Sequence, residues 1–147
     1  SRETFTVIGL HPAAGVKLFE ISGDAQSADS SFALEAFASR GDIAGAIGDD
    51  TRRMYFERFP AAEASVSKER DRILFRQRAG EGELEFVFAG ADGVLIRKRY
   101  YENGSKIWSV SYYEYRLEEG KLYPDGIVLD HHEYGYRLVV RLREIRS

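Results

Sequence analysis

The residues whose types suggest chemistry lie near the end of the chain, in the run Asp130-His131-His132-Glu133. Imidazole and carboxylate groups are common zinc ligands and common groups in proton transfer. The surrounding pattern predicts a β-strand, in which neighbouring side chains point to opposite faces. His131 and His132 therefore cannot readily share one metal ion, and each could use only the carboxylate two positions away, together with distant ligands. We expect a strand end with His132 solvated beside Arg137, and neither a metal site nor a catalytic site.

The rest of the sequence offers little for catalysis and excludes several classes of protein. It contains no nucleophile elbow, phosphate-binding loop, dinucleotide fingerprint or zinc motif. The chain has no cysteine, which excludes disulfides and thiol chemistry. Its formal net charge of -3 argues against a nucleic-acid partner, and no apolar run is long enough to span a membrane. We therefore expect a protein that is not an enzyme and that uses no cofactor.

The stretch from Asp71 to Leu117 reads as four consecutive antiparallel strands joined by tight turns. Gly80-Glu81 suits a two-residue type II′ turn, because glycine enters the positive-φ region at little cost. That turn fixes a register in which apolar residues meet on one face and opposite charges meet on the other. The predicted pairs are Phe75 with Phe86, Ile73 with Phe88, Arg78 with Glu83, and Arg76 with Glu85.

Two further turns extend this meander. Ala91-Asp92-Gly93 suits a three-residue loop, and Asn103-Gly104 is a strong signal for a two-residue hairpin. Both predict an apolar inner face that continues the first one. The predicted pairs are Phe88 with Ile96, Glu85 with Arg99, Tyr100 with Ile107, Ile96 with Ser111, Val94 with Tyr113, Tyr101 with Lys106, and Arg99 with Trp108 as a cation–π contact.

Arginines gather on the predicted outer face of the meander. They could form a basic patch for a phosphate-bearing surface, or they could pair with the glutamates interleaved among them, and we favour charge pairing. These residues are Arg76, Arg78, Arg97 and Arg99, with Glu83 and Glu85 between them.

The remaining elements are assigned from hydrophobic periodicity and turn residues. Residues Ser31 to Ala38 could form a strand or a helix, with alternating Phe32 and Leu34 favouring a strand. The other predicted elements are strands Glu3–Gly9 and Val16–Ser22, a loop Gly23–Ser30, a helix Ile43–Arg58, a polar connector Ala61–Arg70, a strand after Leu122, and a final hairpin Ile127–Ile145 around Tyr134-Gly135. The final register places Ile127, Leu129 and His131 opposite Leu142, Val140 and Leu138.

The single convincing helix is amphipathic. Asp42 is its predicted N-cap, and Pro60 is expected to stop it. Gly45 and Gly48 either allow close packing on a sheet or make the helix a soft lid that can lift. Its apolar stripe comprises Ile43, Ala44, Ile47, Thr51, Met54 and Tyr55.

About nine strands and one helix predict a mainly β (α+β) protein, folded as a single domain over residues 1–147. So many strands favour a strongly curved antiparallel meander sheet or an open half-barrel, with the amphipathic helix covering its concave apolar face. An apolar ligand could occupy that concavity. The residues expected to line it are Phe32, Leu34, Ile43, Ile47, Met54, Tyr55, Phe75, Phe86, Phe88 and Ile96.

Three segments carry a resemblance to a known family. They are Gly9-Leu10 with Gly15-Val16-Lys17-Leu18-Phe19, the run Leu122-Tyr123-Pro124-Asp125-Gly126-Ile127, and the run Gly135-Tyr136-Arg137-Leu138-Val139-Val140. Together with the meander and its helix, they resemble the LolA/LolB-like lipoprotein-carrier superfamily, especially small outer-membrane lipoproteins of Gram-negative bacteria.

The resemblance implies an open β-barrel that holds acyl chains. It also implies a place at the periplasmic face of the outer membrane, with the membrane contacted only through a lipid anchor on a cysteine upstream of Ser1. The family's cavity arginine and its protruding-loop leucine cannot be assigned to residues of this chain.

Three functions follow in order of preference. The first is a non-enzymatic binder of an acyl chain or a lipoprotein. The second is a structural or protein-interaction module of a cell-envelope complex, with a filled core and an envelope protein as its partner. The third is a hydrolase or metal enzyme that uses His131 or His132.

Overall fold

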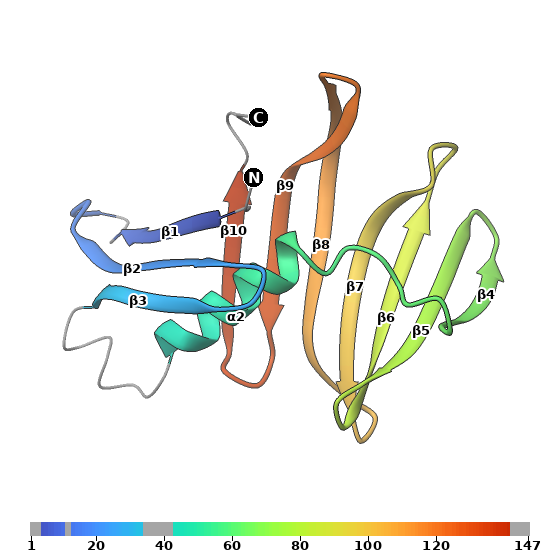
Figure 1. Ribbon diagram of the computed structural model, residues 1–147, viewed down its shortest axis with the longest axis horizontal. Coiled ribbons are helices and arrows are strands. Elements are labelled where there is room, and N and C mark those ends of the chain that lie inside the picture. The colour runs from blue at the N-terminus through green and yellow to red at the C-terminus, as the bar shows by residue number, and fades with distance from the viewer. Residues whose placement is uncertain (1–3, 11–12, 34–42, 142–147) are drawn as a thin grey trace. The chain divides into compact units, whose positions relative to one another are not determined.

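The computed structural model describes residues 4–10, 13–33 and 43–141. Within these residues it contains ten strands in two antiparallel sheets and one helix, so the prediction of a mainly β protein is confirmed (Figure 1). The chain divides into two compact units, Ser1–Arg58 and Phe59–Ser147, and each is described by itself. The prediction of a single domain stays a prediction.

The first unit is a three-stranded sheet, in the order β1-β2-β3, with one helix packed on β2 and β3. Its core includes Phe19 and Ile21 from β2 and Ile47 and Met54 from the helix, all of them buried. Strand β3 begins inside the segment predicted as a loop. The elements are β1 (Thr4–Leu10), β2 (Lys17–Asp24), β3 (Ala28–Ala33) and α2 (Ile43–Tyr55).

Helix α2 ends at Tyr55, three residues before its predicted end at Arg58. Ile47, Thr51 and Met54 are buried, which confirms the predicted stripe, but Asp50 is buried with them at 0% exposure. Its carboxylate accepts a 2.6 Å hydrogen bond from Arg53. The predicted N-cap Asp42 lies outside the described residues.

The second unit is a seven-stranded sheet in the order β10-β9-β8-β7-β6-β5-β4, so every strand pairs with its neighbour along the chain. The sheet is open, with β4 and β10 at its edges. The predicted single sheet of about nine strands is not confirmed, because the strands are divided between two sheets, and β4 lies where a connector was predicted. The strands are β4 (Ser65–Glu69), β5 (Arg72–Ala79), β6 (Gly82–Ala89), β7 (Val94–Glu102), β8 (Ser105–Glu118), β9 (Lys121–His131) and β10 (Tyr136–Arg141).

The meander register is confirmed in full between β5 and β6 and in part beyond them. All four predicted pairs of the first hairpin are present, as are Glu85 with Arg99 and Tyr101 with Lys106. Four other predicted pairs are wrong because two irregularities, at Val87/Phe88 and at Tyr100/Tyr101, each shift the pairing. The predicted pair of Val94 with Tyr113 lies beyond the paired stretch of β7 and β8, which begins at Arg97 and Ser111. As corrected, Phe88 pairs with Leu95 instead of Ile96, Ser111 with Arg97 instead of Ile96, and Trp108 with Tyr100 instead of Arg99.

The last hairpin is also out of its predicted register. Leu129 pairs with Leu138 rather than Val140, and His131 pairs with Tyr136 rather than Leu138. The cause is a longer turn, over residues 132–135, which Gly135 closes by donating its N–H to the His131 carbonyl at 2.8 Å. A shift of two residues leaves every side chain on its predicted face.

Candidate ligand-binding face

One row of register partners crosses all seven strands of the second unit, and we call it the central row. Because partners in an antiparallel sheet point to the same side, these residues share the inner face of the sheet. Six of the seven are apolar and one is a lysine. The central row consists of Val66, Phe75, Phe86, Lys98, Val110, Leu129 and Leu138.

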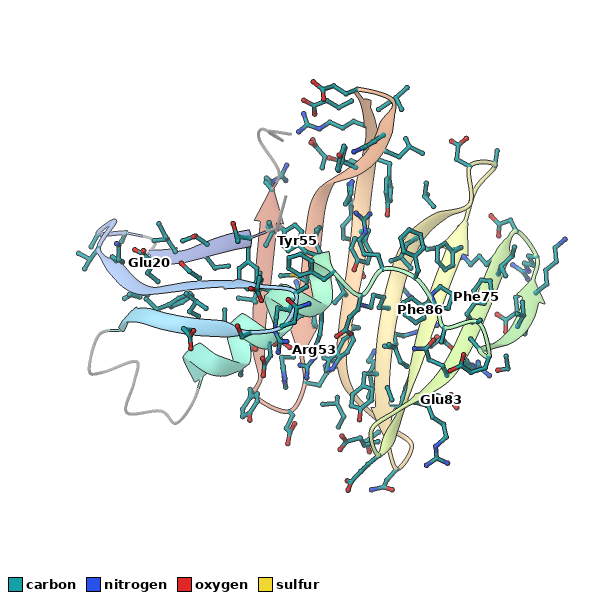
Figure 2. All side chains as sticks on the ribbon, viewed as in Figure 1. Glu20, Arg53, Tyr55, Phe75, Glu83 and Phe86 are labelled. Carbon is teal, nitrogen blue, oxygen red and sulfur yellow. The ribbon has the colours of Figure 1, made fainter. Side chains whose placement is uncertain are left out.

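Exposure along the central row falls from the β4 edge to the middle of the sheet. Val66 is 62% exposed, whereas Phe86 is 1% exposed and Val110 and Leu129 are 0% exposed. Figure 2 shows Phe75 and Phe86 on the neighbouring strands β5 and β6. Apolar surface at the exposed end is thus continuous with the core of the sheet.

Aromatic side chains support the β4 end of this face. Phe75 contacts Phe88 edge-on, with ring centroids 5.6 Å apart. Ile73, the register partner of Phe88, is 40% exposed. An edge-to-face pair adds a modest stabilisation beyond area burial, so these rings form a defined but partly uncovered wall.

Lys98 lies at the centre of the apolar face and is 0% exposed. Its Nζ is 5.5 Å from the centroid of the Phe86 ring and 5.8 Å from that of Trp108. Trp108 in turn stacks on Tyr100 at 5.7 Å. The ring faces carry negative charge density, so they stabilise the ammonium group where water is excluded.

His131 occupies the next row of the inner face, opposite Trp108 on β8 and Tyr136 on β10. Its Nδ1 accepts a 3.3 Å hydrogen bond from the backbone N–H of Tyr134, and its ring lies 4.7 Å from the Tyr134 ring. His131 is buried at the end of β9, and His132, the first residue of the turn that follows, is exposed, as predicted. Within the described ranges, no group of three metal-ligating side chains comes together.

The outer face of the sheet is charged over β5 to β7, where Arg76 and Arg99 form ion pairs with glutamates of β6. Glu85 is 4% exposed and accepts hydrogen bonds from Arg76 Nε at 2.9 Å and from Arg99 Nε at 2.7 Å. The hydrogen bond that Arg76 donates to Glu85, reinforced by the negative charge of that carboxylate, raises the pKa of Arg76. Cross-strand ion pairing therefore accounts for Arg76 and Arg99, and the prediction of charge pairing is confirmed for these two of the four arginines.

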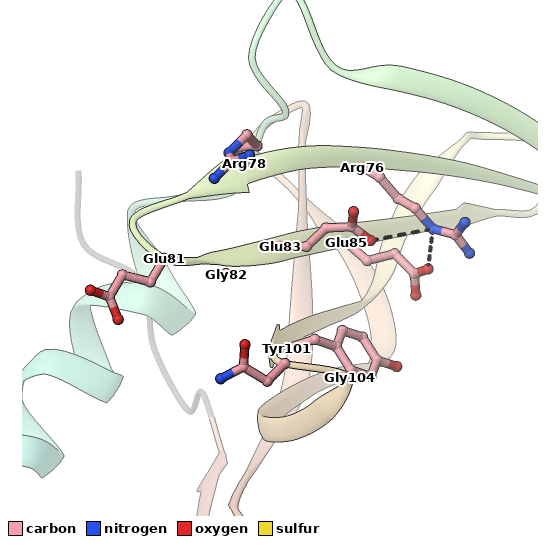
Figure 3. Close-up of a pocket in the computed structure, with 9 residues that line it drawn as sticks. Arg76, Arg78, Glu81, Gly82, Glu83, Glu85, Tyr101 and Gly104 are labelled. Carbon is pink, nitrogen blue, oxygen red and sulfur yellow. Dashed lines mark hydrogen bonds and ion pairs between the residues drawn. The ribbon is translucent and has the colours of Figure 1, made fainter.

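A shallow hollow of about 470 Å³ opens on this charged face, beside the β5–β6 and β7–β8 turns (Figure 3). Arg76 reaches from one side of it to Glu83 at 4.0 Å and to Glu85 at 2.9 Å. Carboxylates and guanidinium groups both line the hollow and neutralise one another. It offers no single charge to a ligand and is a weak candidate for a binding site.

The predicted lining residues are only partly brought together. Phe75, Phe86 and Phe88 lie together on the inner face of the second unit, and Ile96 falls at the irregularity between β6 and β7. Ile47, Met54 and Tyr55 belong to α2, where burial raises the pKa of the Tyr55 phenol against an opposing effect of Arg58. Leu34 and the side chains of Phe32 and Ile43 lie outside the described residues.

Sequence reasoning missed Lys98 and Trp108 as members of this face. The signal for Lys98 was present, because Val94, Ile96, Lys98 and Tyr100 alternate along one strand. Trp108 could not be placed, since the irregularity at Tyr100/Tyr101 moves it to the inner face.

The search for membrane-spanning segments covered the described residues and found no helix of sufficient length and hydrophobicity to cross a bilayer. Comparison of the chain with models of known protein families, with curated proteins and with solved structures gave no match. The resemblance to the LolA/LolB-like superfamily therefore stays a prediction.

Proposed function

We propose that the protein is a non-enzymatic binder of an acyl chain or of an acylated lipoprotein, and that the inner face of the seven-stranded sheet is its binding surface. The observation that carries the proposal is the central row, which leads from the exposed Val66 at the β4 edge to the buried middle of the sheet. A hydrocarbon chain laid along such a row gains free energy in proportion to the apolar area it covers.

The exposed end of the row is the point of access. Val66 and Ile73 leave apolar surface uncovered there, and Phe75 continues it inward. Val110 and Leu129 are fully buried, so the side chains packed around them must move before a hydrocarbon chain can reach them. Only the molecules that are open can bind, so the apparent affinity equals the intrinsic affinity multiplied by the open fraction. We therefore expect modest affinity for short acyl chains.

The resemblance supplies the rest of the proposal. It implies an open half-barrel that holds acyl chains, and a location at the periplasmic face of the outer membrane as a lipoprotein. These features would bring the surface close to its lipid or lipoprotein ligands.

Native mass spectrometry with dodecanoate and dodecan-1-ol tests acyl binding. Val66→Asp should lower the fraction of protein carrying a ligand by about fivefold or more, the equivalent of about 1 kcal/mol, because it puts a charge on the exposed end of the row. Ser67→Asp is the matched control, since Ser67 is also exposed but lies on the opposite face of β4. The absence of adducts with the unaltered protein, or an equal loss in both variants, would contradict the proposal.

A second candidate, an interaction module of the cell envelope, is favoured by an apolar patch on the outer face. Tyr113 is 50% exposed and Val139 is 64% exposed, and Val128 pairs with Val139 between them. A pull-down from solubilised envelope with the unaltered protein and with Val139→Asp separates the two candidates. A partner that is lost in the variant, with no lipid bound to the unaltered protein, would favour this one.

A further inference from the structure

We propose that the free edge of β4 is a docking site for an extended segment of a partner protein, which adds to the sheet as a further antiparallel strand and places an acidic side chain opposite Lys68. The outer edge of β4 is unpaired among the described residues, and all five residues of Ser65–Glu69 are exposed (Figure 1). The inference goes beyond the proposed function, because it concerns the edge of the sheet and holds with or without an acyl chain on the inner face.

The backbone of β4 offers a peptide a row of hydrogen-bonding groups. In an edge strand, the N–H and C=O groups of alternate residues point away from the neighbouring strand. The described neighbour of β4 is β5, so these groups of β4 face away from the sheet. An extended peptide satisfies them with the same antiparallel pairing that joins the other strands of the sheet. Main-chain hydrogen bonds then supply the affinity, and alternate side chains supply the specificity.

The inner-face side chains of β4 define which peptide fits. Val66 lies opposite Phe75 and is 62% exposed, so an apolar side chain beside it extends the central row. Lys68 lies opposite Ile73, so its register position in β5 carries no carboxylate, and an acidic side chain on the added strand supplies one. Because the added strand runs antiparallel to β4, its acidic residue comes two positions before its apolar residue. The preferred segment is therefore Glu or Asp, then any residue, then Val or Ile.

The charge of Lys68 also argues against a second copy of this chain as the partner. In an antiparallel pairing of two β4 strands about a two-fold axis, residues of the same face meet. Lys68 would then lie opposite Ala64, Val66, Arg70 or the Lys68 of the copy, and none of these is acidic. Opposite charges across two strands are stabilising and like charges are destabilising. A segment of a different protein, with an acidic residue in register, suits this edge better than the chain itself.

Two short peptides that differ in one charge test the inference. They are Thr-Glu-Thr-Val-Thr and Thr-Lys-Thr-Val-Thr with blocked ends, and their dissociation constants are measured by NMR titration of the ¹⁵N-labelled protein. The glutamate peptide should bind about tenfold more tightly, because one peptide brings attraction to Lys68 and the other brings repulsion. The largest shifts of backbone amide signals should fall on the residues of β4.

A charge reversal on the protein isolates the role of Lys68. In Lys68→Glu the preference should invert, so that the lysine peptide binds more tightly than the glutamate peptide. Lys106→Glu is the matched control, since Lys106 is also an exposed lysine but lies on β8, inside the sheet, and it should leave the preference unchanged. An unaltered preference in Lys68→Glu, or the same change in both variants, would overturn the inference.

A test on the unaltered protein asks whether the peptide binds as a strand. Two versions of the glutamate peptide carry N-methyl groups on one or the other set of alternate amides. One version should lose binding and the other should keep it, because only one set of amides faces β4. Equal effects of the two modifications, shifts centred away from β4, or no binding of either unmodified peptide would overturn the inference. None of these measurements includes a lipid, so their failure is distinct from a failure of acyl binding.

Discussion

Glu85 shows how a single charged side chain is accommodated inside this sheet. It is buried at 4% exposure, yet both neighbouring strands supply an arginine to its carboxylate. Burial of an ion is tolerated when it is paired and hydrogen-bonded, and removing one partner leaves the others unsatisfied. The stability of the meander should therefore depend on Glu85 far more than on the exposed charges around it.

We predict that Glu85→Gln lowers the free energy of unfolding by about 1–3 kcal/mol, because Arg76 and Arg99 then face each other without a carboxylate between them. Urea unfolding followed by circular dichroism measures the change. Glu83→Gln is the control, since the Glu83 side chain is 55% exposed and lies 4.0 Å from Arg76, and it should change stability by less than about 0.5 kcal/mol. Similar losses in the two variants would show that burial of Glu85 does not matter.

At the scale of elements, hairpin geometry depends on a few backbone positions. Asn103 and Gly104 have φ values of 49° and 78°, the left-handed pair that the Asn-Gly signal predicted. Gly82 has a different role, because a Cβ atom built there would lie 2.2 Å from the Tyr101 carbonyl oxygen and 2.7 Å from the Tyr100 ring. The close approach of β6 and β7 thus requires glycine at this position.

Gly82→Ala should destabilise the protein by about 2 kcal/mol or more, because a neighbouring backbone must move to admit the new methyl group. Gly126→Ala is a matched strand control, since its Cβ would meet Tyr113 at 3.8 Å, an ordinary contact. Thermal unfolding of both variants measures the difference. A Gly82→Ala protein as stable as Gly126→Ala would mean that β6 and β7 are not so closely spaced.

The sequence was sufficient for the elements whose signals are local. The turns at Gly80 and Asn103-Gly104 positioned β5 to β8 along the chain, and alternation assigned Phe75 and Phe86 to one face. The irregularity at Tyr100/Tyr101 left no local signal, because both residues suit a regular strand equally well. Asp50 was missed for a similar reason, since its burial depends on packing around α2 rather than on its own polarity.

At the scale of the whole molecule, one edge of the seven-stranded sheet is formed by an exposed strand, β4. All five residues of β4 are exposed, and its outer edge is unpaired among the described residues. Such edges promote pairing between molecules, and a lysine within the edge strand discourages it. Lys68 occupies that position in β4.

Replacing Lys68 with valine should therefore increase self-association, because one face of β4 would then carry two valines and the edge strand would lose its lysine. Light scattering at rising protein concentration measures the effect. Lys106→Val is the control, since Lys106 is also exposed but lies on β8, inside the sheet. We expect aggregation to begin at a concentration at least several-fold lower for Lys68→Val, and an equal effect of both substitutions would count against a protective role for Lys68.

The order of strands in the seven-stranded sheet has one more consequence. Each strand lies beside the one made just before it, so assembly needs only the closure of short loops, and the entropy lost in each closure is small. A polypeptide emerging from the ribosome can add hairpin to hairpin without waiting for a distant segment. The same arrangement means that the outermost strands can detach singly while the middle holds together.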